Sequence, residues 1–90
     1  MSSLASRILG REVLTLEQFA HEVMARLSWE YPEAAVTQPR PELIAVKHGD
    51  GRPSEYTLHP SYRAYQRDPR AKEQEIARFV QWVATTLPRR

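Results

Sequence analysis

The apolar positions of the chain follow a helical period in two places. From Thr15 to Leu27 they recur every three or four residues, which predicts an amphipathic helix with one apolar stripe. Thr15 and Gln18 have the spacing of a capping box, in which each residue satisfies a backbone donor of the other. Pro32 disfavours helical geometry at the residue before it, so we expect this helix to end near Glu30.

Short extended segments are expected after the first helix. Residues 34–38 fit a brief strand, which we expect Pro39 and Pro41 to limit because proline lacks a backbone donor. Residues 43–46, Leu-Ile-Ala-Val, are apolar at every position. This pattern is typical of an inner strand with both faces covered.

A hairpin is predicted next, because residues 49–51 are Gly-Asp-Gly and supply positive-φ positions for its loop. The stretch after the loop alternates, with Tyr56 and Leu58 directed inward. Pairing Val46 with Tyr56 and Ile44 with Leu58 places all four side chains on one face. We therefore expect this register.

The last third of the chain predicts two helices. Pro60 opens a short helical turn, and Asp68 caps a second start with Pro69 at the first helical position. The second helix is long, and its apolar stripe consists of Ile76, Phe79, Val80, Val83, Ala84 and Leu87. Its period indicates a helix packed against a sheet.

The order of these elements predicts an α+β fold: a helix, a three-stranded antiparallel sheet, a short helix and a long C-terminal helix. Helices packed on one face of the sheet would let two apolar stripes meet one apolar sheet face. Ninety residues suffice for one small core. We expect residues 15–90 to form this domain and residues 1–14, which Gly10 interrupts, to form an N-terminal arm or a short helix.

Composition narrows the class of protein. The chain has no cysteine, so neither disulfides nor thiolate zinc sites are expected. No apolar run reaches the ~18 residues of a membrane span, and no signal peptide opens the chain, so a cytoplasmic location is expected. Residues 1–34 carry three Arg against five Glu, whereas residues 61–90 carry six Arg and one Lys against three acidic residues. This asymmetry suits head-to-tail packing or an acidic partner.

Several segments together resemble the YtpQ-like family of bacterial proteins. They are Leu14-Thr15-Leu16-Glu17-Gln18-Phe19-Ala20, Tyr31-Pro32-Glu33, Gly49-Asp50-Gly51, Tyr62-Arg63-Ala64-Tyr65 and Asp68-Pro69. The resemblance covers residues 14–87 and rests on capping, turn and packing signals. It implies that the chain corresponds to the first segment of a longer protein. The family is uncharacterised, so the resemblance assigns no catalytic or binding residue.

No pattern of catalytic, metal-binding or cofactor-binding residues is present. His21, His48 and His59 match no ligand spacing, so we interpret them as surface or hydrogen-bonded histidines. Residues 49–51 precede no helix N-terminus and therefore do not fit a phosphate loop. The serines at positions 2, 3 and 6 have neither a general base nor an oxyanion context in the sequence, so nucleophilic catalysis has no support. We expect that the protein is not an enzyme and that it has no cofactor, metal or small-molecule substrate.

Two tryptophans lie off the helix faces that should meet the sheet. Trp29 is about 180° from Ala20 at ~100° per residue, and Trp82 is about 120° from Ile76. Because Trp and Arg anchor protein interfaces, we interpret Trp82, Trp29 and Arg78 as partner-binding residues. Arg78 would then stack on the Trp82 indole.

These residues favour a protein–protein interaction or scaffold module, with homodimerisation through the last helix as one form. A structural interpretation stays open, in which Trp29 lies under the N-terminal arm and Trp82 packs against the other helix.

An alternative function is nucleic-acid binding. Aromatic and basic residues interleave at the start of the last third, as in proteins that bind single strands. The basic residues are Arg63, Arg67, Arg70 and Lys72. The competing interpretation is that Tyr62 and Tyr65 dock together on the core and leave the arginines solvated. Nucleic-acid binding would predict salt-sensitive retention on a polyanion.

Overall fold

The computed structural model describes residues 13–87 and shows an α+β fold in the expected order. Residues 1–12, most of the expected N-terminal arm, lie outside the described residues. The elements are α2 (Leu16–Glu30), β1 (Ala35–Arg40), β2 (Leu43–Lys47), β3 (Ser54–Thr57), α3 (His59–Arg67), the 3-10 turn η1 (Pro69–Ala71) and α4 (Lys72–Thr86).

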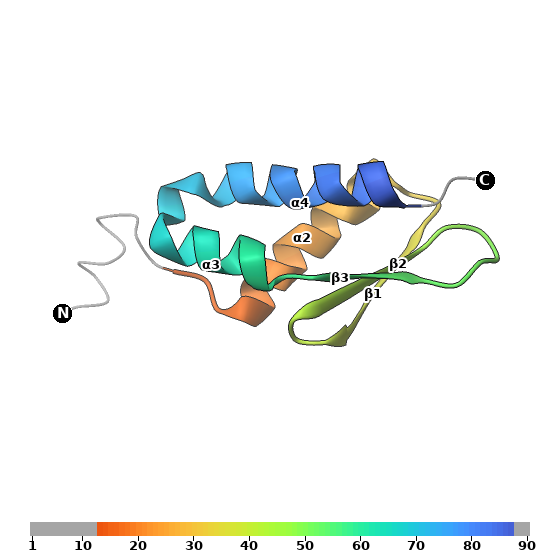
Figure 1. Ribbon diagram of the computed structural model, residues 1–90, viewed down its shortest axis with the longest axis horizontal. Helices are drawn as coiled ribbons and strands as arrows, with labels where there is room; N and C mark the ends of the chain where they lie inside the picture. Colours follow the sequence, from red (N-terminus) through yellow and green to blue (C-terminus); the bar gives the residue numbers. More distant parts are fainter. Residues whose placement is uncertain (1–12, 88–90) are drawn as a thin grey trace.

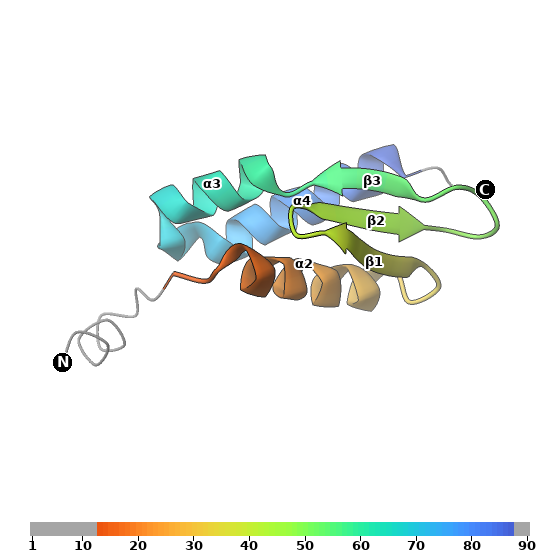
Figure 2. The same cartoon turned by 90° about the horizontal axis from the view of Figure 1, so that it is seen from below.

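The three strands form one antiparallel sheet in the order β1-β2-β3. Figures 1 and 2 show α2 and α4 on one face of this sheet, with α3 continuing beyond the end of β3. The central position of β2 confirms the inner strand that its apolar run predicted. Ile44, Ala45 and Val46 of β2 are all buried.

Helix α2 begins and ends where the sequence predicted. The Thr15 hydroxyl accepts a hydrogen bond from the Gln18 backbone N–H at 3.1 Å, and the Gln18 side chain accepts one from the Thr15 N–H at 2.9 Å. This confirms the capping box. The buried residues of α2 are Phe19, Ala20, Val23 and Leu27, which together form the expected stripe.

The register between β2 and β3 differs from the expected one by two residues. Ile44 pairs with Tyr56, and Val46 pairs with Ser54, so the pairing of Val46 with Tyr56 was wrong. A shift of two residues keeps every side chain on its own face, because side chains alternate with a period of two. The predicted inward positions of Tyr56 and Leu58 are therefore confirmed, with exposures of 3% and 0%.

Strand β1 also extends further than expected. It continues through Pro39 to Arg40, and its pairing with β2 shifts between Thr37 and Arg40. An edge strand accommodates proline because its outward backbone groups need no partner in the sheet. Pro39 therefore lies inside the strand instead of limiting it.

The start of the long C-terminal helix also differs from the one predicted at Asp68. The Asp68 side chain accepts a hydrogen bond from the Arg70 N–H at 3.3 Å, but it caps η1 and not α4. Helix α4 begins at Lys72 without a side-chain cap. The tertiary packing of α4, more than local capping, fixes where it begins.

An aromatic cluster joins α2 and α3 and holds the segment before α2. The rings of Phe19 and Tyr65 stack with centroids 5.2 Å apart, which confirms that the α3 tyrosines dock on the core. The Leu14 N–H donates to Tyr65 Oη at 2.7 Å, and Tyr62 Oη donates to the Leu14 carbonyl at 2.7 Å. Leu14, which was expected to belong to the arm, is thus tied to the core.

Candidate functional site

Trp82 lies on α4 in an aromatic cluster with β3. Its ring meets Tyr56 edge-on, with centroids 5.0 Å apart and planes at 86°. It meets Phe79 in the same manner, at 5.6 Å and 88°. Both geometries are favourable edge-to-face arrangements. Trp82 is nevertheless 40% exposed, so its ring is held from one side and open to solvent on the other.

The end of α4 holds the position of this cluster. The hydroxyls of Thr86 and Tyr56 are hydrogen-bonded at 3.1 Å, which links α4 directly to β3. The side chains of Thr85 and Thr86 both donate to the Trp82 carbonyl, at 3.0 and 2.7 Å. Both bonds lie in the last turn of α4 and tie its end to the backbone of Trp82. Trp82 is therefore fixed at both backbone and ring.

Arg78 lies one helical turn before Trp82, as expected, but it does not stack on the indole. Its guanidinium donates to Glu75 Oε2 at 3.5 Å, and no cation–π pair is found among residues 13–87. Glu75 is 8% exposed, so this long contact places a cation beside a buried carboxylate, and buried charges need such a partner. The side chain of Arg78 stays 70% exposed.

The charges of α4 are confined to its first half. Residues 72–78 carry two basic and two acidic side chains, whereas residues 79–87, Phe-Val-Gln-Trp-Val-Ala-Thr-Thr-Leu, carry none. Exposed positions in this second half include Gln81, Trp82 and Thr85. A solvent-facing surface without charge that includes a tryptophan resembles the central part of a protein interface in composition.

Trp29 occupies a different surface. It is 67% exposed on α2 and lies beside Arg26 and Glu30 at a shallow hollow. Trp82, by contrast, contacts β3 from the flank of α4 that lies opposite its α2-facing residues. The structure therefore keeps Trp82 and Arg78 together and leaves Trp29 apart from them. The aromatic contacts of Trp82 are with Tyr56 of the sheet and Phe79 of its own helix.

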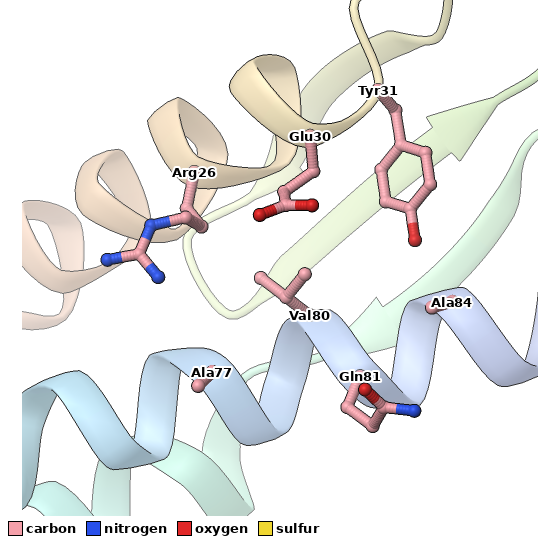
Figure 3. A pocket seen from close by; sticks show the side chains of 7 residues that line it. All are labelled: Arg26, Glu30, Tyr31, Ala77, Val80, Gln81 and Ala84. Carbon is pink, nitrogen blue, oxygen red and sulfur yellow. The ribbon is translucent and has the colours of Figure 1, made fainter.

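A groove runs between α2 and α4 on the outer side of the helix pair (Figure 3). It is lined by Arg26, Glu30, Tyr31, Ala77, Val80, Gln81 and Ala84. Figure 3 shows Val80 and Ala84 on α4 below the side chains of α2. Two ion pairs join the first turn of α4 to α2: Arg26 with Glu73 at 2.6 Å and Lys72 with Glu22 at 3.0 Å.

The groove lacks the features of a reactive site. Arg26 and Glu30 are the only charged side chains among the residues that line it. The histidines lie on separate elements: His21 on α2, His48 after β2 and His59 at the start of α3. Within residues 13–87, no cluster of His, Cys, Asp and Glu could hold a metal ion.

The basic residues considered for nucleic-acid binding are divided between two environments. Arg63 and Arg67 lie exposed on α3. Arg70 contacts Asp68 at 3.3 Å, and Lys72 contacts Glu22 at 3.0 Å. Ion pairing uses part of the positive charge that a phosphate backbone would otherwise neutralise.

Sequence reasoning missed Tyr56 and Glu75 as parts of this site. The inward direction of Tyr56 was correctly predicted, but its contact with Trp82 depends on the angle at which α4 crosses the sheet. Glu75 lies four residues before the predicted core residue Phe79. That spacing places it on the same helix face and was a usable signal.

The chain was compared with known proteins at three levels. No family model, no curated protein and no solved structure matched it. The resemblance to the YtpQ-like family therefore stays a prediction. In residues 13–87, no helix has both the length and the apolar character needed to cross a membrane.

Proposed function

We propose that this protein is a non-catalytic protein–protein interaction module whose partner contacts Trp82 and Arg78. The observation that carries the proposal is the state of Trp82, which is held edge-on by two aromatic rings while 40% of it remains exposed. A side chain that is already immobilised loses little conformational entropy when a partner covers it.

Residue type supports the same proposal. Trp and Arg are the side chains most enriched among residues that dominate binding energy in interfaces. Here they lie one turn apart on α4, and the nine residues after Arg78 carry no charge. The partner would bury an uncharged surface with one cation at its border, which is the arrangement of an interface core and its polar rim.

The partner is either a different protein or a second copy of this chain. Self-association through α4 is the simpler case, because it can be measured on the purified protein alone. Nucleic-acid binding is supported less well, since Asp68 and Glu22 already pair with Arg70 and Lys72.

The proposal is tested by immobilising three baits: the unmodified protein, Trp82→Ala and Trp29→Ala. Each bait is exposed to an extract of the cells that produce the protein, and retained proteins are identified by mass spectrometry. Sedimentation of the same three proteins measures self-association in parallel. We expect a specific partner or a dimer with the unmodified protein and with Trp29→Ala, and a loss of at least tenfold with Trp82→Ala.

Trp29→Ala is the matched control, because it also removes an exposed helical tryptophan. Arg78→Gln is a second variant that leaves the aromatic cluster in place and retains a donor for Glu75. It should weaken binding by a smaller factor. The proposal would be abandoned if no partner or dimer is detected, or if both tryptophan variants behave alike while circular dichroism shows them folded.

A further inference from the structure

The backbone groups of β3 alternate between its neighbour and the open edge of the sheet. The Leu58 N–H donates to the Glu42 carbonyl at 2.8 Å. Tyr56, two residues before Leu58, pairs with Ile44. In an antiparallel ladder, hydrogen-bonded pairs recur every second residue. The N–H and C=O groups of Glu55 and Thr57 therefore point away from β2 toward the edge.

The two edges of the sheet differ in their ability to accept another strand. Along β1, Pro39 removes a donor, and an irregular pairing follows Thr37. Both features are devices by which proteins protect sheet edges. Strand β3 has neither, because Ser54–Thr57 contains no proline and keeps a regular register with β2. Within the described residues no element pairs with β3 on its far side (Figure 2).

The open edge lies next to the candidate site. Tyr56, at the middle of β3, contacts Trp82 through its ring, and the Tyr56 hydroxyl is bonded to Thr86. A strand added beside β3 would place alternate side chains on the core side of the sheet. There they would meet the uncharged second half of α4 and the exposed part of the Trp82 ring.

We propose that β3 accepts an extended segment of a partner protein as a fourth strand. This segment places an apolar side chain on Trp82 and an acidic side chain, two residues away, on Arg78. The inference rests on the proposed function and specifies how the partner binds. Main-chain hydrogen bonds to Glu55 and Thr57 would provide affinity, and contacts with α4 would provide specificity, as in other cases of strand addition.

Spacing and charge determine the chemistry of the segment. Alternate residues of a strand are about 6.6 Å apart, and residues four apart on a helix have Cβ atoms about 5–6 Å apart. Trp82 and Arg78 can therefore contact positions i and i+2 of one strand. Arg78 favours an acidic residue, because it is 70% exposed and its contact to Glu75 is long, at 3.5 Å.

The experiment begins with selection of random ten-residue peptides displayed on phage against the immobilised protein. The enriched peptides should contain an apolar and an acidic residue two positions apart. The strongest of them is synthesised, and its affinity is measured for the unmodified protein, Glu55→Pro, Glu55→Thr, Arg78→Gln and Trp82→Ala.

Glu55→Pro removes an edge donor without disturbing the β2 ladder, and Glu55→Thr removes the same carboxylate but keeps the N–H. We expect Glu55→Pro to weaken binding by about tenfold or more. The proline removes a main-chain hydrogen bond and prevents the peptide strand from approaching β3 closely. Glu55→Thr should stay within about twofold of the unmodified protein. Amide hydrogen exchange should show new protection at Glu55 and Thr57 when the peptide binds.

The outcomes separate this inference from the proposed function. Binding that is lost in Trp82→Ala but unchanged in Glu55→Pro would overturn strand addition and leave the interaction module standing. Selection that yields no peptide would also overturn strand addition, while the bait experiment still decides the function. Enriched peptides without an acidic residue, unaffected by Arg78→Gln, would refute the role of charge.

Discussion

The two exposed tryptophans differ in what surrounds them. Trp82 is packed edge-on against Tyr56 and Phe79, whereas no aromatic contact involves Trp29 within the described residues. Their exposures are 40% and 67%. Exposure alone would rank Trp29 as the better contact residue. Immobilisation reverses that ranking, because ordering a free side chain costs roughly 0.5–1.5 kcal/mol when a partner binds.

The charged residues around the two tryptophans also differ. Trp82 follows Arg78 and begins an uncharged surface, while Trp29 lies between Arg26 and Glu30. A partner that covered Trp29 would also have to desolvate Glu30 and the ion pair between Arg26 and Glu73, which costs free energy. The α4 surface therefore carries the stronger case for binding.

The largest effect on this comparison should come from removing the support beneath Trp82. Phe79→Ala deletes a side chain that is 1% exposed and contacts both Tyr56 and Trp82. We expect the free energy of unfolding to fall by about 3–5 kcal/mol, as for other buried aromatic residues. Urea denaturation measures the loss. A loss below about 1 kcal/mol would show that the aromatic cluster does not hold Trp82.

Removing Trp82 itself should have a smaller effect on stability. Because part of the ring is exposed, Trp82→Ala should cost about 1–3 kcal/mol through lost burial and two edge-to-face contacts. Thermal unfolding followed by circular dichroism measures this cost on a protein that remains folded. Equal stability of Trp82→Ala and the unmodified protein would mean that the ring is as free as that of Trp29.

Removing Trp29 should change stability least. Trp29→Ala leaves every described aromatic contact in place, so we expect a change within about 0.5 kcal/mol, as for ordinary surface substitutions. The same urea titration serves as the measurement. A cost comparable with that of Trp82→Ala would contradict the distinction between the two tryptophans and would restore the interpretation of Trp29 as a packing residue.

The structure also separates signals that act locally from those that depend on packing. The capping box of Thr15 and Gln18 acts within one turn, and it marked the start of α2 correctly. Asp68 and Pro69 gave an equally clear local signal, yet they begin η1 three residues before α4. There the connection from α3 to α4 had to fit both helices, and packing outweighed the cap.

The sequence by itself determined the α+β class, the order of the elements, the central position of β2 and the inward faces of its strands and helices. These depend on periodicity and on local backbone chemistry, which each segment carries within itself. It also identified Trp82 and Trp29 as lying off the core stripes, since the angle around a helix follows from residue number.

Only the tertiary structure decided the register of β3, the surroundings of Trp82 and the burial of Glu75. A register shift of two residues leaves every face unchanged, so the hydrophobic pattern cannot detect it. Which strand residue meets Trp82 depends on how α4 crosses the sheet, and that angle is set by the combined packing of both helices. The candidate site therefore arises from a contact between residues 26 positions apart, Tyr56 and Trp82, which neither segment specifies alone.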